Sequence, residues 1–592
     1  MRAGQIMSLV QWRPWTDASF EEARDQDKPV LLSIVAKWCQ FCAQLDSDVY
    51  ANDAIATYIN DNYIPVRVDS DVRPEINARY TQGGWPSTCI LTGEGDLLWG
   101  GNALPREHMA QLLPQVLGQY RGDKNALNAH ITQLRLQVRE QNTPPAFDPS
   151  APLQPQLPLH ILMASKFEFD FAFGGFGHSG QKFPHVDVLE LVADALVRSY
   201  REGAGDPDLR FMLDRTLMSI TRGELHDRVN HGFFRYCQTA DWRNPMIEKL
   251  LDDNASIART AARVYQSTGD NAWLELATDT LGYLDTQLGI DGAGYGASQY
   301  ADAEYYSQPD EERREWNSPA IDETFVAGAN AQAARAWYSY WQATGDVAAL
   351  DKSVAIMDRV ASLVGEDGCP RHSEADGSSE GLLVDASRVL AASVDLYEAG
   401  VGDKWLMLAE MIAVWMQNRL GDRAGGAFHD HPIREDALGH LKFGTKDLPD
   451  NMIAADAFLR LFLATGEDEY RTTGTQNITA LQVAAPQMGF LAAGLALASI
   501  RALAMPVIVH IVGTPDDKRT KELVAAAHRP ARLERFVQVL DPTNEADREH
   551  IDNLEYEVTD IPTAYPRIGE NPLAPTIDPE TLRETVDQAS IA

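Results

Sequence analysis

The spacing of apolar and polar residues divides this chain into an N-terminal part of short mixed elements and a longer part that is almost wholly helical. Over the first 120 residues, brief apolar runs alternate with amphipathic stretches, as strands and helices do when they alternate along a chain. The pattern predicts strands at 30–35, 64–68, 87–91 and 97–100, and helices at 39–46, 53–61, 73–80 and 106–120.

Beyond residue 158 the apolar residues recur with a helical period as far as about Ala504. Short glycine-acid turns such as Gly269-Asp270 and Gly345-Asp346 separate successive helices, because glycine ends a helix and an acidic residue starts the next. A second set of loops, glycine-rich and mostly carrying an aromatic residue, alternates with these turns at 174–177, 230–234, 292–295, 367–370 and 425–428. About twelve helices in six hairpins predict an (α/α)6 toroid with these loops at its mouth, and an irregular helical solenoid is the alternative.

Proline content and a return to mixed elements mark the boundaries between the predicted units. Residues 141–158 contain six prolines, too many for a helix or a central strand, so they predict a linker. From Pro506 onward, strands at 507–512 and 536–540 alternate with helices at 517–527 and 579–588. We therefore expect a multidomain protein: an N-terminal α/β domain over 1–140, a linker over 141–158, the all-α toroid over 159–504 and a small C-terminal α/β module over 505–592.

The most specific chemical motif is the dithiol of Cys39 and Cys42, which follows the first apolar strand and opens a helix. A βαβ unit followed by a β-hairpin and a helix is the thioredoxin topology, and a helix N-terminus there favours thiolate over thiol. No second cysteine pair with zinc-ligand spacing exists in the sequence, so redox chemistry is favoured over a metal site.

Trp85 and Pro86 form the second part of the predicted redox site. A proline that opens a strand cannot donate a hydrogen bond to the sheet, and a cis peptide bond is one way to accommodate it. We expect cis-Pro86 to face the dithiol and Trp85 to dock the backbone of a substrate. Cys39 would then attack a disulfide and Cys42 would resolve the intermediate.

Composition and charge limit the partners of the protein. A formal net charge of −35 disfavours nucleic acid and anionic membrane surfaces, which repel a polyanion. The N-terminus has no apolar leader and the chain has no run of 18 apolar residues, so we expect a cytoplasmic protein without membrane contact. We expect no metal and no cofactor, although His429-Asp430-His431 leaves a metal site open as a weaker alternative.

Several motifs together resemble the spermatogenesis-associated thioredoxin-domain family, in which a thioredoxin-like domain of unknown function is fused to a six-hairpin barrel. They include the CxxC motif, Gly83-Gly84-Trp85-Pro86 and Gln299-Tyr300-Ala301-Asp302. Further matches are Trp12 to Ile34, Lys182-Phe183-Pro184, Asp227 to Asn254 and Val507 to Gly513. The resemblance implies the fold and the order of the domains.

The chain departs from the family pattern at positions where that pattern has histidines. In the family pattern a histidine follows each cysteine of the dithiol, whereas here Gln40 follows Cys39 and Ala43 follows Cys42. In the barrel, Arg228, Phe234 and Met246 occupy positions that are histidine in the pattern. Metal binding or acid-base chemistry that needs those histidines is therefore in doubt.

A set of polar and aromatic residues on the toroid loops forms a second candidate site. Six-hairpin barrels resemble sugar epimerases and glycoside hydrolases, and glycoside hydrolysis needs two carboxylates that flank one bond. We expect Phe176, Arg235, Tyr295 and Phe428 to converge on one cavity with the acids, and the alternative is a set of salt-bridged loop contacts. The candidate substrate-binding residues are Lys182, Asp227, Arg235, Tyr236, Trp242, Glu248, Lys249 and Asp302.

Two functions follow from these two sites. The first is a thiol-disulfide oxidoreductase that acts on a protein or small-molecule disulfide, with the barrel as a substrate- or partner-binding module. The second is a carbohydrate-active barrel enzyme with a structural thioredoxin domain, which would hold a sugar-like ligand. A non-catalytic scaffold is a third possibility.

Overall fold

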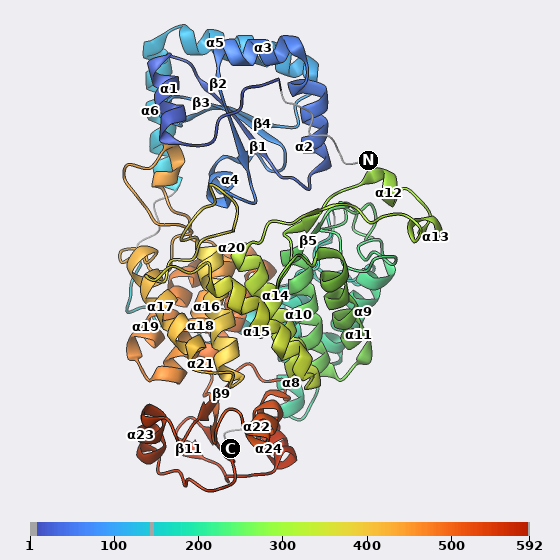
Figure 1. Ribbon diagram of the computed structural model, residues 1–592, viewed down its shortest axis with the longest axis vertical. Helices are drawn as coiled ribbons and strands as arrows, with labels where there is room; N and C mark the ends of the chain where they lie inside the picture. Colours follow the sequence, from blue (N-terminus) through green and yellow to red (C-terminus); the bar gives the residue numbers. More distant parts are fainter. Residues whose placement is uncertain (1–8, 142–146, 179, 590–592) are drawn as a thin grey trace.

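The computed structural model describes residues 9–141, 147–178 and 180–589, and it arranges three units along the long axis of the molecule. The N-terminal α/β unit lies at one end, the helical body lies in the middle, and the C-terminal α/β unit lies at the other end (Figure 1). The N-terminal unit therefore meets the helical body at a single end.

The N-terminal unit is a four-stranded sheet in the order β2-β1-β3-β4. β1 (Val30–Val35) runs parallel to β2 (Ile64–Asp69) and antiparallel to β3 (Ser87–Leu91), which pairs with β4 (Leu97–Asn102). All six residues of β1 are buried, as expected for a central strand covered on both faces. The helices are α1 (Asp17–Asp25), α2 (Gln40–Leu45), α3 (Asp53–Asn62), α4 (Pro74–Tyr80), α5 (Arg106–Arg121) and α6 (Lys124–Gln141).

All eight elements predicted for this unit are present with ends that differ by at most two residues, whereas α1 and α6 were missed. The α6 helix follows α5 after a break at Gly122 and ends where the predicted linker begins. Residues 142–146 of that linker lie outside the described residues, and residues 147–156 contain no helix or strand.

The helical body is a closed toroid. Within the described residues, each of six inner helices packs against the next, and α21 packs against α8 to complete the ring, so the toroid prediction is confirmed over the open solenoid. Each inner helix also packs against one outer helix. The inner helices are α8 (Val186–Arg201), α10 (Leu251–Thr268), α14 (Ala327–Thr344), α16 (Leu383–Glu398), α18 (Leu448–Thr465) and α21 (Ala493–Leu503). The outer helices are α7 (Leu157–Glu168), α9 (Pro207–Arg222), α11 (Asn271–Tyr283), α15 (Val347–Ala361), α17 (Lys404–Arg419) and α19 (Asp468–Leu481).

The two kinds of loop lie at opposite ends of the toroid. Each short turn leads from an inner to an outer helix, and Gly269, Gly345 and Gly466 end their helices in the left-handed conformation with φ of 68°, 79° and 76°. All five glycine-rich loops lead from an outer to an inner helix. They therefore gather at the end that receives the N-terminal unit.

An asparagine on an inner helix fixes the aromatic residue of a glycine-rich loop. Asn330, the fourth residue of α14, accepts the backbone N–H of Tyr295 at 2.8 Å and donates to the backbone carbonyl of Tyr295 at 3.0 Å. The same pair of bonds joins Asn254 in α10 to Phe233, and Asn451 in α18 to Phe428. The loops are thus held by a repeated hydrogen-bonded contact with the inner ring.

The aromatic residues of the glycine-rich loops are buried in the core. Phe176, Tyr295 and Phe428 are only 1%, 3% and 2% exposed. Phe176 packs near Phe169 and Phe490. The prediction that Phe176, Tyr295 and Phe428 converge on one ligand cavity is therefore wrong, because Tyr295 and Phe428 belong to one hydrophobic core cluster and Phe176 to another.

The C-terminal unit is a second four-stranded sheet, in the order β11-β10-β8-β9. Its β9 packs on α16 and α18 and its α22 packs on α14, at the end of the toroid that carries the short turns. The sequence pattern missed α23 and β10; β10 contains Pro566, which argues against a strand, and α23 has one buried residue, Ile551. The elements are β8 (Val507–Val512), α22 (Lys518–His528), β9 (Arg535–Leu540), α23 (Glu545–Asn553), β10 (Thr563–Ile568), β11 (Asn571–Pro572) and α24 (Pro579–Gln588).

One stretch, Asp468–Leu503, has the length and composition of a membrane-spanning helix. In the structure it is divided among α19, α20 (Ala485–Met488), α21 and short 3₁₀ turns. Because α21 packs against α7, α8 and α18, this apolar stretch supplies a wall of the toroid.

We predict that Asn330→Ala destabilises the toroid by about 2–4 kcal/mol, because it leaves the buried N–H and C=O of Tyr295 without partners. Thermal or urea unfolding of the full chain measures the change. Asn418→Ala is the matched control, since Asn418 is exposed on α17 and donates to the Val414 carbonyl of its own helix. Equal stabilities of the two variants would contradict the structural role of the asparagine contact.

Candidate functional site

Cys39 and Cys42 lie at the start of α2, the helix that follows β1. Cys39 is the N-cap residue, and its Sγ accepts the backbone N–H of Cys42 at 3.3 Å. A hydrogen bond from the Cys42 thiol lowers the pKa of Cys39 against the opposing effect of burial, and the same bond together with burial raises the pKa of Cys42. Both are free thiols, and Cys39 ionises more easily than Cys42.

Two tryptophans flank the dithiol. Trp38 precedes Cys39, and Trp85 precedes Pro86 through a cis peptide bond, as predicted. The two indole rings meet edge to face with centroids 5.3 Å apart, and Trp85 packs against the buried cluster that contains both cysteines. The predicted redox residues are therefore together on one face of the N-terminal unit.

That face is covered by a three-stranded sheet at the mouth of the toroid, formed by β5 (Lys249–Leu250), β6 (Ser298–Gln299) and β7 (Ile321–Asp322). Leu250 and Tyr300 pack against the cluster of Cys39 and Cys42, and the backbone N–H of Ala301 donates to the Trp38 carbonyl at 3.2 Å. Cys39 is 6% exposed and Cys42 is 3% exposed. The dithiol thus lies inside the interface between the two units.

Arg235 and Glu248 extend from the toroid to the same place. The Arg235 guanidinium lies over the rings of Trp38 and Trp85, 4.8 and 5.3 Å from their centroids, and its Nη1 donates to Glu248 at 2.9 Å. The guanidinium also lies 5.6 Å from the ring of Tyr236. The negative charge of Glu248 acts against ionisation of Cys39. Three residues predicted for a separate barrel site therefore belong to the surroundings of the dithiol.

The other predicted barrel residues are engaged in internal contacts. Lys249 and Arg313 both bind the buried carboxylate of Asp227, at 2.7 and 2.6 Å, and burial lowers the pKa of Lys249 to about 8 although Asp227 opposes the shift. Asp302 caps the short helix α12 (Ala303–Tyr306) by accepting the N–H of Tyr305. Lys182 binds Asp170 at 2.9 Å, and the buried Trp242 donates to the Phe173 carbonyl at 2.9 Å. These residues do not converge with Arg235 and Glu248 on one cavity.

A charged contact at Lys37 joins the two units beside the dithiol. Lys37 Nζ lies 3.1 Å from Asp322 in β7 and 3.9 Å from Asp69 at the end of β2. Burial, and the nearby charge of Asp71, raise the pKa of Asp69 to about 6. One cation thus contacts two of three neighbouring carboxyl groups that would otherwise repel one another.

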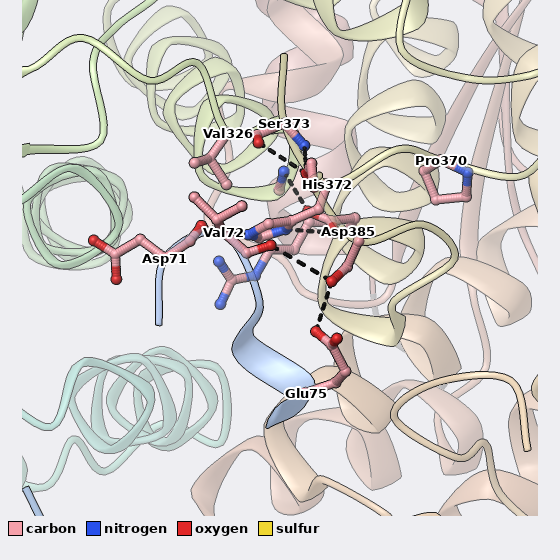
Figure 2. A network of polar contacts seen from close by, with 12 residues as sticks. Asp71, Val72, Glu75, Val326, Pro370, His372, Ser373 and Asp385 are labelled. Atoms are coloured by element: carbon pink, nitrogen blue, oxygen red, sulfur yellow. Dashed lines mark hydrogen bonds and ion pairs between the residues drawn. The ribbon is translucent and has the colours of Figure 1, made fainter. Parts of the chain in front are cut away.

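A histidine forms a second anchor between the units (Figure 2). His372 Nδ1 lies 2.8 Å from Asp385 and Nε2 lies 3.0 Å from the Asp71 carbonyl. Both partners are acceptors, so both ring nitrogens must carry hydrogen to complete the two bonds. Burial opposes this charge, but the Asp385 carboxylate overcomes it and raises the pKa of His372. Nearby, the Ser379 hydroxyl of the toroid donates to the Glu75 carboxylate of the N-terminal unit at 2.6 Å.

The third anchor joins Arg79 to Asp430, the central residue of the His429-Asp430-His431 motif that was considered as a metal site. Arg79 in α4 donates through Nη2 to Asp430 at 2.7 Å and to the Phe443 carbonyl at 2.8 Å. His431 Nε2 lies 2.8 Å from the carbonyl of Leu441. Among the residues that the structure describes, no group of three or more His, Cys, Asp or Glu side chains is arranged to hold a metal ion. Asp430 therefore joins the two units.

Sequence reasoning missed Lys37, Arg79, His372 and Asp385 as members of this interface. Asp322 lies 285 residues after its partner Lys37, and Asp430 lies 351 residues after its partner Arg79. No local spacing of residues therefore indicates these contacts. The one available signal was the position of His372 directly after the glycine-rich loop at 367–370.

Comparison with known proteins agrees with the resemblance in the sequence. Residues 4–139 match the Thioredox_DsbH family model, described as a protein of unknown function, DUF255. The uncharacterized protein B0495.5 of Caenorhabditis elegans is 27% identical over 301 residues, and human spermatogenesis-associated protein 20 is 25% identical over 316 residues. These matches cover 49% and 50% of this chain but only 41% and 39% of the two relatives.

Two solved structures are similar to part of this chain. The cellobiose 2-epimerase of Spirochaeta thermophila has a TM-score of 0.47 at 15% identity, over 63% of this chain and 98% of the epimerase chain. The GH76 alpha-mannanase BT2949 of Bacteroides thetaiotaomicron has a TM-score of 0.42 at 12% identity, over 59% of this chain and 94% of that chain.

We predict that His372 makes the stability of the full chain depend on pH. Because its pKa is raised in the folded state, its contribution is fully present below its unfolded pKa of about 6.5 and is lost as pH rises through the folded value. The stability difference between the wild type and His372→Gln, measured by thermal unfolding, should be largest near pH 6 and shrink at alkaline pH. His160→Gln, at an exposed position on α7, is the control, and a difference between wild type and His372→Gln that does not change with pH would refute the charged anchor.

Proposed function

We propose that this chain, which is similar to the spermatogenesis-associated family of thioredoxin-like proteins, is a thiol-disulfide oxidoreductase whose dithiol is covered by its own toroid. The observation that carries the proposal is the asymmetry of the two cysteines. Cys39 caps α2 and has a lowered pKa, whereas the pKa of Cys42 is raised. A nucleophile that ionises easily and a partner that keeps its proton are what a two-step exchange requires.

In the first step the Cys39 thiolate attacks one sulfur of the substrate disulfide. The substrate S–S bond breaks, a mixed disulfide forms with Cys39, and the departing thiolate takes up a proton. In the second step Cys42 loses its proton and attacks the Cys39 sulfur, which releases the second substrate thiol. The substrate gains two electrons and two protons, and the Cys39–Cys42 pair becomes a disulfide that an external dithiol returns to the reduced state.

The flanking side chains fit a role in directing this exchange. Trp38, Trp85 and Arg235 surround the start of α2, and the cation-π contacts of Arg235 are worth about 0.5–2 kcal/mol each. In the closed arrangement the Trp38 carbonyl is already bonded to Ala301, and Tyr300 and Leu250 cover the cysteines. A protein disulfide therefore reaches Cys39 only when this part of the toroid moves away. The toroid then serves as the partner-binding module that controls access.

The three acids on which the carbohydrate-active alternative was based are engaged in internal contacts. Hydrolysis needs two carboxylates that flank one bond, about 5–10 Å apart. Asp227 is held by Lys249 and Arg313, Glu248 is held by Arg235, and Asp302 caps a helix. We therefore propose the redox function alone. Five free cysteines fit a reducing compartment such as the cytoplasm.

We predict that Cys42→Ser accumulates a mixed disulfide on Cys39 when the full chain is incubated with a small aromatic disulfide, because the resolving thiol is absent. Cys39→Ser should form at least tenfold less adduct in the same time, as measured by intact-mass spectrometry. Cys237→Ser is the control, since Cys237 is buried and burial raises its pKa to about 12. Equal trapping in Cys42→Ser and Cys39→Ser would remove the basis of the redox proposal.

We also predict that Lys37→Met opens the interface and speeds alkylation of Cys39 severalfold near neutral pH. The substitution removes the cation among Asp69, Asp71 and Asp322, whose mutual repulsion then favours separation of the units. Lys404→Met is the matched control, because Lys404 is also an exposed lysine paired with an aspartate, Asp358, but lies far from the dithiol in sequence and between outer helices. An unchanged rate in Lys37→Met would show that this contact does not control access.

A further inference from the structure

The axis of the toroid contains a polar cavity that the redox proposal does not use. Its volume is about 260 Å³, and it is lined by all six inner helices. Residues 530–535, which lead into β9 of the C-terminal unit, close it at the end opposite the dithiol. At about 30 Å³ per molecule, this space would hold roughly eight waters or one small organic molecule.

Most charges on the cavity wall are already neutralised by ion pairs between inner helices. Glu190 on α8 binds Arg259 and Arg263 on α10, at 2.7 and 2.9 Å. Asp456 on α18 binds Arg501 on α21. Asp395 on α16 binds Arg335 at 2.8 Å and Arg460 at 2.6 Å. These pairs fix the inner ring and leave little free charge.

Arg535 is the exception at the closed end. Its side chain is only 9% exposed, and among the described residues no carboxylate lies within ion-pair distance of it. Nη1 donates to the carbonyls of His528 and Pro530 at 3.0 and 2.6 Å, while the buried Nε has no partner. Burial lowers the pKa of Arg535 to about 10 against the opposing effects of Tyr338 and of the Glu398 carboxylate, which is itself bound to Arg460. A buried cation in this state is stabilised by an anion.

Two neutral groups on the same wall also lack partners. The hydroxyl of Tyr338 and the Oε1 of Gln332, both on α14, are buried and make no hydrogen bond within the described structure. A buried polar atom without a partner costs about 1–3 kcal/mol, so such atoms are normally met by water or by a ligand. At the mouth end, Asp187 at the start of α8 lines the cavity, and its carboxylate would repel an anion there.

We propose that the closed end of the axial cavity binds a small organic anion, with its phosphate or carboxylate group on Arg535 and a hydrogen bond from the hydroxyl of Tyr338. A guanidinium binds two oxygens of a carboxylate or of a phosphate through paired N–H donors. The site lies between the toroid and the C-terminal unit, because α14 supplies Tyr338 and β9 supplies Arg535. Binding would therefore strengthen the contact between those two units.

Isothermal titration calorimetry of the full chain with inorganic phosphate and, separately, with succinate tests this site at constant ionic strength. We expect saturable binding of at least one probe, which also identifies whether phosphate or carboxylate is preferred. Arg535→Gln should weaken it at least tenfold, and Tyr338→Phe should weaken it severalfold. Because the Tyr338 hydroxyl has no protein partner, the phenylalanine variant should fold and keep its thermal stability.

Arg529→Gln is the matched control, since Arg529 also belongs to the C-terminal unit and donates to a toroid carbonyl, that of Ala343 at 2.6 Å, but does not line the cavity. It should bind the preferred probe as the wild type does. Absence of saturable binding with both probes, or the same loss in Arg529→Gln as in Arg535→Gln, would overturn the proposal. Unchanged binding in both Tyr338→Phe and Arg535→Gln would also overturn it, because the anion would then be bound elsewhere.

Discussion

The contact between the toroid mouth and the dithiol is the interaction on which the rest of this molecule depends. The sheet of β5, β6 and β7 places Leu250, Tyr300 and Ala301 directly on the start of α2. The same contact buries both cysteines, orients Arg235 over the two tryptophans and closes one end of the toroid. A redox site that is normally exposed is here part of a domain interface, so access to Cys39 and the position of the toroid are coupled.

Charge explains why this interface needs its anchors. The chain has a formal net charge of −35, and two acidic units repel each other unless cations lie between them. Lys37 and Arg79 of the N-terminal unit pair with Asp322 and Asp430 of the toroid. Arg235 and His372 pair with carboxylates of the toroid itself, and they contact the N-terminal unit through its two tryptophan rings and the Asp71 carbonyl. The pKa of His372 is raised from its usual value by the Asp385 carboxylate, so its charge links the strength of docking to pH. The ion pairs therefore hold the toroid over the dithiol, and the strength of this contact changes with pH.

Local patterns predicted the elements of this protein well and their partners poorly. The apolar run 30–35, the helix after Cys39 and the glycine turns at 269, 345 and 466 are determined by neighbouring residues, and the structure has all of them. The loop aromatics were misjudged because a glycine-rich loop with an aromatic looks the same whether the ring faces a ligand or the core. Asn330, one helix away, decides which occurs for Tyr295. Arg235 and Glu248 were likewise assigned to the barrel because nothing near them in sequence indicates that two tryptophans of another domain cover them.

The central claim is that Cys39 and Cys42 form a reversible redox pair within the closed molecule. The most direct test is to equilibrate the full chain in thiol buffers of graded potential, trap the free thiols by alkylation, and quantify the Cys39–Cys42 disulfide by mass spectrometry. The account predicts one two-electron transition, with a tenfold change in the oxidised-to-reduced ratio for about every 30 mV and both cysteines oxidised together. Cysteines that stay reduced at every potential, or that become oxidised only by pairing between molecules, would contradict it.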